Sequence, residues 1–389
     1  MSEGRIAVIG AGTMGSQIAQ QAALHGYSVS LYDERPEQLA RALESNRGHL
    51  QRRVEKGVLT PLEFDAALAR VEPLDNLADA VSGCSLVIEA IVEQLPVKQE
   101  VFAKLESVVS ADCIIATNTS SLSVTAIASA CKKAERVIGL HFFNPATLMP
   151  LVEVIPAVQT AAHLPAACVE LMNSWKKVPV IAKDTPGFIV NRLARSFYGE
   201  SIKIYEEGMA DMPTIDWALK TFGGFRMGPF ELMDLIGNDV NYTVTETVWT
   251  QMYYDPRYRP SLTQKKMVES KRFGRKSGRG YYDYSEGAVN PAPTEDPVLG
   301  QAIFDRVIAM LINEAVDAFY LGIATREDLD QAMMKGVNYP KGLLQWCDEI
   351  GAQKILSTLE SLYADYLEER YRPSVLLRKM ASSGKKFYN

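Results

Sequence analysis

The stretch Arg5-Ile-Ala-Val-Ile-Gly-Ala-Gly-Thr-Met-Gly15 decides the fold of the first half of the chain. A short β-branched run is followed at once by three glycines with the spacing GxGxxG, and then by a helical pattern. In this arrangement Gly10 permits a tight turn, Gly12 lets the backbone approach a pyrophosphate, and Gly15 allows close helix–strand packing. The pyrophosphate would lie on the N–H groups and the positive dipole end of the helix. The stretch therefore predicts a dinucleotide-binding βαβ unit.

The second predicted strand ends in an acidic residue. Asp33 closes the run Tyr27-Ser-Val-Ser-Leu-Tyr-Asp33, about 20 residues beyond the glycines. A carboxylate at this place accepts hydrogen bonds from a ribose 2′-hydroxyl and repels a 2′-phosphate, so NAD is favoured over NADP. Arg35 lies close by, and because an arginine can accommodate that phosphate, NADP stays open as an alternative.

Short β-branched runs alternate with helical stretches up to residue 183, which predicts an α/β domain of the Rossmann type with a doubly wound, mostly parallel sheet. The pattern becomes helical after Asp184-Thr-Pro-Gly187 and stays so to the end. The expected domains are 1–183, 184–284 and 298–389, with a proline-rich linker before the third. The expected strands are 5–9, 27–33, 85–91, 113–117, 136–141, 151–155 and 178–182, and the main helices of the first domain are 13–25, 37–56, 96–110 and 163–176.

The two helical domains form an internal repeat. The segment that begins at Asn191-Arg192 aligns without a gap with the segment that begins at Asp305-Arg306. Two such copies are able to pack on each other as two subunits would. The sequence therefore predicts all-α domains in tandem. Matched pairs include Glu200 with Glu314, Gly208 with Gly322, Asp216 with Asp330, and Gly228 with Gly342.

The composition excludes several classes of protein. The 389 residues are 47% hydrophobic and carry a net charge of −6, which argues against nucleic acid as a partner. The five cysteines are scattered and form no CxxC, so neither a disulfide framework nor a metal site is expected. No apolar run reaches the roughly 18 residues of a membrane helix, and the first strand begins too early for a leader peptide. A reducing, cytoplasmic location is expected.

His141 is the histidine best placed for chemistry. It ends the strand Arg136-Val-Ile-Gly-Leu140, and ligands of doubly wound sheets bind beyond the carboxyl ends of strands. Its side chain exchanges protons near pH 7, although a core or turn position would explain it equally well when it is taken alone. Glu153 lies among apolar residues of the next strand, where burial is costly unless the carboxylate is paired. Glu153 would then orient His141 and raise its basicity; the alternative is a solvent-facing acid on an edge strand.

The polar run Thr117-Asn-Thr-Ser-Ser121 follows another strand end. Its hydroxyl and amide groups are able to hydrogen-bond an alcohol, a carbonyl or a nicotinamide amide. The same run would also serve as an ordinary capping cluster before a helix.

Six motifs, GAGTMG, EAIVE, NTSSL, HFFNP, LVEVI and KDTPGFIVNRL, occur in this order. Together they resemble the 3-hydroxyacyl-CoA dehydrogenase family, over nearly the whole chain. The resemblance implies NAD-dependent oxidation of (S)-3-hydroxyacyl-CoA to 3-oxoacyl-CoA, in fatty-acid or aromatic-acid breakdown or in short-chain acyl-CoA metabolism. It leaves the acyl chain open, with 3-hydroxybutyryl and 3-hydroxyadipyl as examples. The alternatives are a dehydrogenase of a free 3-hydroxy acid or sugar acid, and a non-catalytic, crystallin-like protein.

The resemblance also implies roles for individual residues. His141 matches the family's general base and Glu153 its acidic partner, while Ser120 and Asn191 match groups that hold the substrate oxygen. Lys56 matches a basic residue that meets the CoA phosphates. Cofactor contacts are implied for Gly10, Gly12, Thr13, Met14, Gly15, Asp33, Glu93, Lys98, Asn144 and Lys276.

The second helical copy departs from the family pattern. It has Asp305 where the first copy has Asn191, and its tail Ser383-Gly-Lys-Lys-Phe387 lacks the run GRKSGRGYY. We expect it to carry no active site and to act as a packing partner. Since two-domain members of the family dimerise through the helical domain, a monomer with an internal pseudo-dimer and a homodimer are both open.

Overall fold

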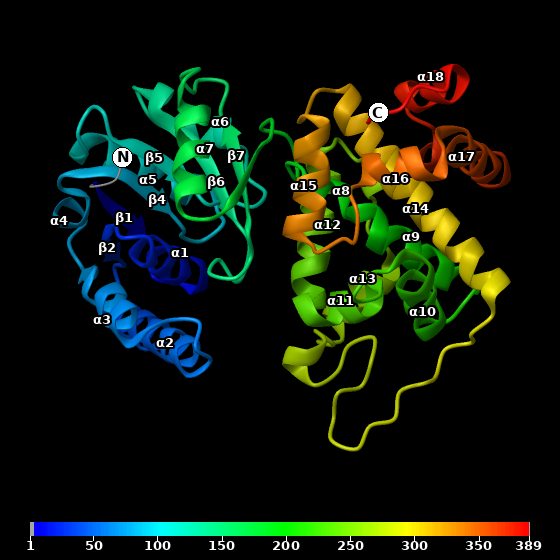
Figure 1. The fold of residues 1–389 in the computed structure, drawn as a ribbon, viewed down its shortest axis with the longest axis horizontal. Helices are drawn as coiled ribbons and strands as arrows, with labels where there is room; N and C mark the ends of the chain where they lie inside the picture. Colours follow the sequence, from blue (N-terminus) through cyan, green and yellow to red (C-terminus); the bar gives the residue numbers. More distant parts are fainter. Residues whose placement is uncertain (1–3, 389) are drawn as a thin grey trace. The chain divides into compact units, whose positions relative to one another are not determined.

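The computed structural model describes residues 4–388, and the chain divides into two compact units between Thr185 and Pro186. The first unit is built on a single sheet with helices, and the second unit is helical (Figure 1). The predicted fold class, an α/β domain followed by all-α domains in tandem, is confirmed.

The sheet of the first unit has the strand order β3-β2-β1-β4-β5-β6-β7-β8. Neighbouring strands run parallel except β6 and β7, which are antiparallel. The strands are β1 (Arg5–Ile9), β2 (Ser28–Tyr32), β3 (Val71–Leu74), β4 (Cys84–Glu89), β5 (Ile114–Thr117), β6 (Val137–Phe142), β7 (Leu151–Pro156) and β8 (Val178–Ile181).

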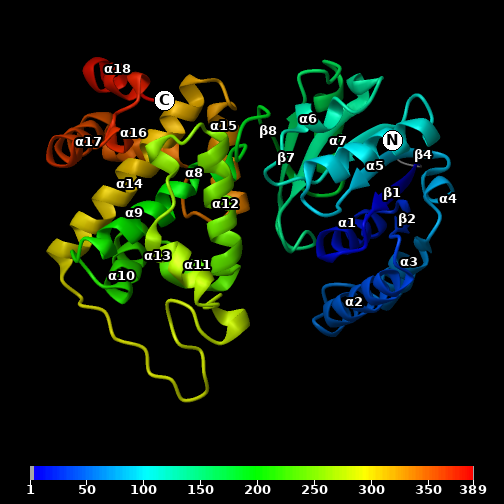
Figure 2. The same ribbon diagram turned by 180° about the vertical axis from the view of Figure 1, so that it is seen from behind.

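Helices cover both faces of this sheet (Figures 1 and 2). Four successive residues of β1, from Ile6 to Ile9, are each at most 2% exposed, and successive strand residues point to opposite faces. Both faces are therefore buried, as expected for parallel strands joined by helices. The helices are α1 (Thr13–Leu24), α2 (Pro36–Glu55), α3 (Pro61–Ala69), α4 (Leu77–Val81), α5 (Leu95–Val108), α6 (Val124–Ala128), the short η1 (Ala134–Arg136) and α7 (Leu164–Ser174).

Strand β3 and the short helices α3, α4 and α6 are not among the elements predicted from the sequence. The strand Val71-Glu-Pro-Leu74 lies at the edge of the sheet, where proline is tolerated because one side of the strand needs no ladder partner. Its side chains are half-buried or exposed, so no continuous apolar run marks it. This segment forms a strand because β2 pairs with it, and not because its own sequence has a strand pattern.

The second unit contains two helical copies joined by an extended segment of residues 285–296, drawn in yellow in Figure 1. The first copy has α8 (Val190–Leu193), α9 (Arg195–Glu206), α10 (Met212–Gly223), α11 (Pro229–Ile236), α12 (Asn238–Gln251), η2 (Pro256–Tyr258), α13 (Leu262–Glu269) and η3 (Arg275–Ser277). The second has α14 (Pro297–Tyr320), α15 (Arg326–Gly336), α16 (Leu343–Ile350), α17 (Ala352–Tyr366), η4 (Glu369–Tyr371) and α18 (Val375–Ser383).

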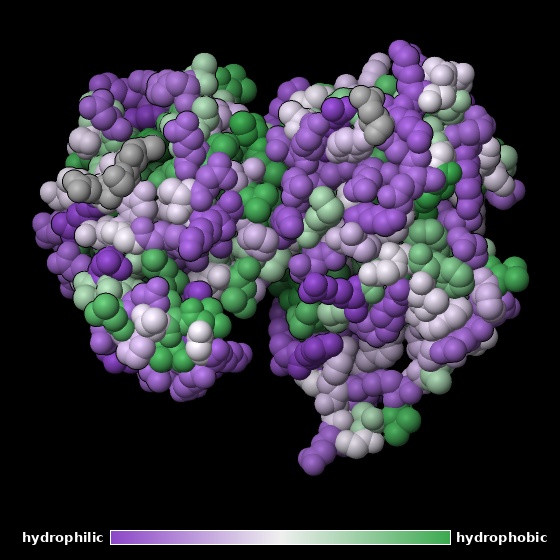
Figure 3. All heavy atoms as spheres, in the orientation of Figure 1, coloured by the Kyte–Doolittle hydropathy of each residue, from purple (hydrophilic) through white to green (hydrophobic). Residues whose placement is uncertain are grey.

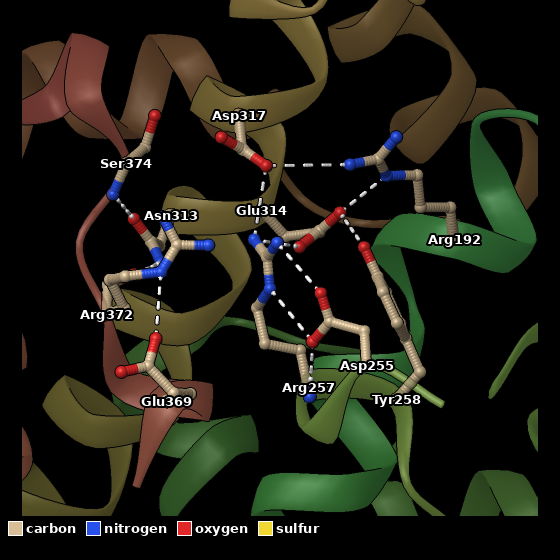
Figure 4. Close-up of polar contacts among 10 residues, drawn as sticks. All are labelled: Arg192, Asp255, Arg257, Tyr258, Asn313, Glu314, Asp317, Glu369, Arg372 and Ser374. Atoms are coloured by element: carbon tan, nitrogen blue, oxygen red, sulfur yellow. Dashed lines mark hydrogen bonds and ion pairs between the residues drawn. The ribbon is translucent and has the colours of Figure 1, made fainter. Parts of the chain in front are cut away.

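The two copies exchange buried ion pairs reciprocally. The Arg192 Nε atom donates to Glu314 Oε1 at 2.5 Å, and the matched Arg306 Nε donates to Glu200 Oε1 at 2.6 Å. All four side chains are at most 7% exposed. Figure 4 shows the first cluster, in which Arg257 and Tyr258 also bind Glu314. Because each copy supplies the arginine for the other's glutamate, the contact has the self-complementary form of a twofold interface.

The chain's end repeats a contact that the sequence pattern does not reveal. In the first copy the amides of Tyr281 and Tyr282 donate to Asp234, and in the second the amides of Phe387 and Tyr388 donate to Asp348. The tail therefore makes the same anchoring contact as the longer GRKSGRGYY run, although most of that run is missing. No helix within residues 4–388 has both the length and the apolar composition needed to cross a membrane.

Candidate cofactor site and catalytic pair

The glycine-rich turn between β1 and α1 has the geometry expected of a pyrophosphate cradle. Gly10 has a φ of +101°, a left-handed conformation that favours glycine. A Cβ atom on Gly15 would lie 1.8 Å from the Gly10 carbonyl oxygen, whereas a Cβ on Gly12 would meet nothing within 4 Å. Gly15 is thus required by packing, and Gly12 keeps open the space above the helix N-terminus.

Asp33 follows β2 and is 7% exposed. Its carboxylate accepts hydrogen bonds from the Ala11 amide at 2.9 Å and from the Arg35 amide at 3.1 Å. The Arg35 guanidinium lies 3.4 Å from the same carboxylate. Arg35, the residue that left NADP as an alternative cofactor, therefore points its guanidinium toward Asp33. These residues line a cavity of about 680 Å³, whose walls include Gly10, Gly12, Tyr32, Asp33, Arg35, Leu77 and Val101.

The open space at Gly12 gives a direct test of the cradle. The substitution Gly12→Val is expected to weaken NADH binding by about tenfold or more, because the side chain would occupy the space a phosphate needs. The fold should persist, since Gly12 has extended backbone angles. Fluorescence titration of NADH measures the effect. Gly48→Val, at a helix position with equally open surroundings, is the control, and equal affinities for the two variants would contradict the assignment.

His141 and Glu153 form a buried pair across β6 and β7. The two residues are direct partners in the antiparallel register, and His141 Nδ1 lies 2.7 Å from Glu153 Oε2. His141 is 5% exposed and Glu153 is fully buried. The Glu153 carboxylate fixes the orientation of the imidazole ring through Nδ1. An acid–base pair of this geometry is a recurrent catalytic arrangement.

The loop that carries Ser120 follows β5 and is fastened by Glu93. Glu93 Oε1 accepts hydrogen bonds from the Thr119 hydroxyl at 2.5 Å, the Ser120 amide at 2.9 Å and the Ser121 amide at 3.2 Å. Burial raises the pKa of Glu93, but the charge of Lys98 and these donors outweigh it, so the pKa is lowered overall. Glu93 is therefore an anion that shapes the Ser120 turn.

Lys98 is more deeply buried than its implied cofactor contact suggests. Only 1% of its side chain is exposed, and Nζ lies 2.6 Å from Glu89 and 3.2 Å from Glu93. Glu89, at the end of β4, also accepts from the Thr117 hydroxyl and the Ile91 amide, each at 2.7 Å. The sequence reasoning missed Glu89, although a glutamate that ends a strand of apolar residues was a usable signal.

Asn144 lies in the loop after β6 and is hydrogen-bonded by a residue of α1. Gln17 of α1 accepts a hydrogen bond from the Ala146 amide at 2.6 Å and donates to Asn144 Oδ1 at 3.5 Å. Lys177 Nζ donates to the carbonyls of Ala146 and Met149, and burial lowers its pKa to about 8. The helix that begins at the glycine-rich turn is thus tied to the loop beyond His141, a link that sequence reasoning missed.

The remaining residues that the sequence assigns to the site are divided between the two units. Asn191 is a half-buried residue of α8, and Lys276 is half-exposed and paired with Asp239 at 2.6 Å. Both belong to the second unit. Lys56 is exposed at the end of α2 in the first unit. Thr13 and Met14 open α1 beside the glycines.

Comparison with known proteins identifies the chain's relatives. Residues 5–185 match the NAD binding domain of 3-hydroxyacyl-CoA dehydrogenase, and residues 187–284 and 303–387 match the C-terminal domain of 3-hydroxyacyl-CoA dehydrogenase. The chain belongs to the 3-hydroxyacyl-CoA dehydrogenase family. It is an oxidoreductase whose first unit is the family's NAD-binding domain.

Individual relatives span the chain to different extents. The chain is 39% identical to a 3-hydroxyadipyl-CoA dehydrogenase of Escherichia coli, over 97% of both chains. It is similar to the crystal structure of a 3-hydroxybutyryl-CoA dehydrogenase from Escherichia coli, with a TM-score of 0.91, 38% identity and coverage of 97% and 98%. It is 36% identical to the fatty acid oxidation complex subunit alpha of Acinetobacter baylyi, over 98% of this chain but only 56% of that protein.

The geometry of the first unit is suited to binding NAD. The Gly12 space, the helix N-terminus and the buried Asp33 carboxylate supply a place for the pyrophosphate and an acceptor for ribose hydroxyls. Within residues 4–388, no group of three or more histidine, cysteine or acidic side chains is arranged to hold a metal ion.

Proposed function

We propose that this family member oxidises (S)-3-hydroxyacyl-CoA to 3-oxoacyl-CoA with His141 as general base. The observation that carries the proposal is the buried pair of His141 and Glu153 at 2.7 Å, with His141 near the carboxyl end of β6. An imidazole oriented by a carboxylate takes a proton from an alcohol as the neighbouring carbon loses hydride. Bound NAD supplies the hydride acceptor.

In this proposal the protein's own residues accept the hydroxyl proton of the substrate and hold its oxygen atom. Neutral His141 receives the hydroxyl proton on Nε2, and the C–H electron pair leaves as hydride while the carbonyl forms. The positive charge that builds on the imidazole is stabilised by Glu153. Ser120 and Asn191 are proposed to hold the substrate oxygen, so that proximity and orientation lower the barrier.

The CoA part of the substrate is assigned to the α2–α3 region. Lys56 follows the last residue of α2, and the nearby Val58 and Leu62 are 62% and 79% exposed. Apolar side chains lie on the surface of this helical hairpin in Figure 3. We assign the CoA phosphates to Lys56 and the apolar parts of CoA to its neighbours, because a cation beside exposed apolar side chains fits a ligand of both characters.

The proposal also includes the domain boundaries, the oligomeric state and the cellular location of the protein. We propose domains at 1–183, 184–284 and 298–389, with the reciprocal ion pairs of the two helical copies taking the place of a subunit contact, which favours a monomer. All five cysteines are buried and free, which supports a reducing, cytoplasmic location. A role in acyl-CoA breakdown follows from the reaction class.

The test compares a thioester with its free acid. NADH oxidation is followed with acetoacetyl-CoA and, in parallel, with acetoacetate. Activity confined to the thioester is expected, because an enzyme that binds CoA uses that binding energy in the transition state. Equal activity on acetoacetate would instead assign the protein to free hydroxy acids. NADH binding without activity on either compound would also contradict the proposal.

A further inference from the structure

Arg195, at the start of α9, is a buried cation without an anionic partner. Only 6% of the residue is exposed. Its guanidinium donates to the carbonyl of Asn191 at 2.9 Å, to the hydroxyl of Thr245 at 2.9 Å and to the carbonyl of Asn241 at 3.4 Å. None of these oxygen atoms is charged, and within residues 4–388 no carboxylate forms an ion pair with Arg195.

Burial of an unpaired charge is costly for a folded protein. The burial lowers the pKa of Arg195, whereas its neighbours in the fold, Arg192 and Arg306, are matched with glutamates. The unit thus neutralises its other deeply buried arginines, whereas Arg195 has only neutral oxygen acceptors and the ring of Tyr198, 5.0 Å from its guanidinium. An anion that arrives from outside would supply the missing partner.

The internal repeat shows that helix packing does not require this arginine. The position equivalent to Arg195 in the second copy is Ala309, which is fully buried. The two copies also differ at a second matched position, where the first copy has Phe225 and the second copy has Tyr339. The first copy therefore contributes Arg195 and the second contributes Tyr339, whereas the pair of positions related by the repeat holds Ala309 and Phe225.

The tyrosine adds an independent sign of a ligand site. The hydroxyl of Tyr339 is buried and has no hydrogen-bond partner among residues 4–388. Tyr339 is 5% exposed, and its ring centroid lies 5.7 Å from that of Phe197, which follows Arg195 by two residues in α9. A buried hydroxyl without a partner loses the hydrogen bonds it had in water. A carboxylate bound by the guanidinium would also accept a bond from this hydroxyl.

We propose that Arg195 and Tyr339 bind the carboxylate at the far end of a dicarboxylic acyl chain. The inference rests on the proposed function, which assigns the substrate oxygen to Asn191. Arg195 begins α9 four residues after Asn191 of α8, a rise of about 6 Å at 1.5 Å per residue, and its Nε atom donates to the backbone carbonyl of Asn191 at 2.9 Å. In a six-carbon diacid, three carbon–carbon bonds of about 1.5 Å each separate C3 from the distal carboxyl carbon.

The length of such a chain is comparable to this separation along the helices. A substrate held by its 3-oxygen at Asn191 would place the distal carboxylate of such a chain beside the guanidinium. Arginine presents a planar fork of donors that matches a carboxylate. A chain that ends in a methyl group would leave the same charge unpaired and would bind less well.

The experiment uses two substrates that differ only at this end. NADH oxidation by the full-length protein is measured with 3-oxoadipyl-CoA and with 3-oxohexanoyl-CoA, and the ratio of the two kcat/KM values is the readout. We expect the wild type to favour the diacid by about tenfold or more. Arg195→Met should lower this ratio by about a hundredfold, and Tyr339→Phe by about fivefold. Arg378→Met, which removes an exposed arginine, should leave the ratio unchanged.

The outcomes separate this inference from the proposed function. Absence of activity on both thioesters would overturn the proposed function. Activity on both with the same ratio in wild type and Arg195→Met would overturn the inference alone. If Arg195→Met does not fold, competition binding to the wild type decides, since adipoyl-CoA should bind at least tenfold more tightly than hexanoyl-CoA. Equal binding would overturn the inference.

Discussion

His141→Ala is expected to lower kcat for 3-oxoacyl-CoA reduction by roughly 10²- to 10⁴-fold, the usual contribution of a general acid–base. The substitution removes the group that exchanges the substrate proton, while the glycine-rich turn and Asp33 that are assigned to the cofactor stay intact. The NADH dissociation constant should therefore change little. Steady-state kinetics and NADH titration of the same preparation separate the two effects.

The pH dependence of the wild type gives a second readout of His141. Neutral imidazole is needed to oxidise the alcohol and protonated imidazole to reduce the ketone. Oxidation should rise with pH and reduction should fall. Glu153→Gln keeps the shape of the pair but removes the charge that stabilises the imidazolium, so it should slow the reaction in both directions. Flat profiles in both directions under conditions where chemistry limits the rate would rule out His141 as the base.

Glu314→Gln is expected to lower the free energy of unfolding of the helical unit by about 3–5 kcal/mol. Glu314 is 2% exposed and accepts from Arg192 and Tyr258, each at 2.5 Å, and from Arg257 at 3.4 Å (Figure 4). An amide in its place leaves buried guanidinium groups without their principal anion. Urea unfolding monitored by tryptophan fluorescence measures the loss.

An exposed ion pair near the Glu314 cluster provides a matched control for Glu314→Gln (Figure 4). Glu369 pairs with Arg372 at 3.1 Å, but both side chains are more than half exposed. Exposed pairs contribute little because water screens them. Glu369→Gln should therefore leave the unfolding midpoint unchanged. Equal effects of the two substitutions would show that the exchange of buried ion pairs does not hold the two copies together.

Local sequence rules determined a large part of this protein. Glycine spacing identified the cofactor turn, since only glycine allows the φ of Gly10 and the approach of α1 to the Gly10 carbonyl. The carboxylate at the end of the second strand identified Asp33, and β-branched runs located seven of the eight strands. The gapless repeat revealed the tandem helical copies. Each of these features depends on neighbours within a few residues or on a regular period, which a sequence displays directly.

Long-range pairing determined the rest. The antiparallel turn from β6 to β7 sets His141 opposite Glu153, and the sequence offered that pair only as one of two possibilities. The half-exposed strand β3 exists because β2 pairs with it. Glu89, Gln17 and Arg195 bind Thr117, Ala146 and Asn241, which lie far from them along the chain. The charge state, burial and orientation of a side chain depend on what the folded chain places around it, and only the tertiary structure decides that.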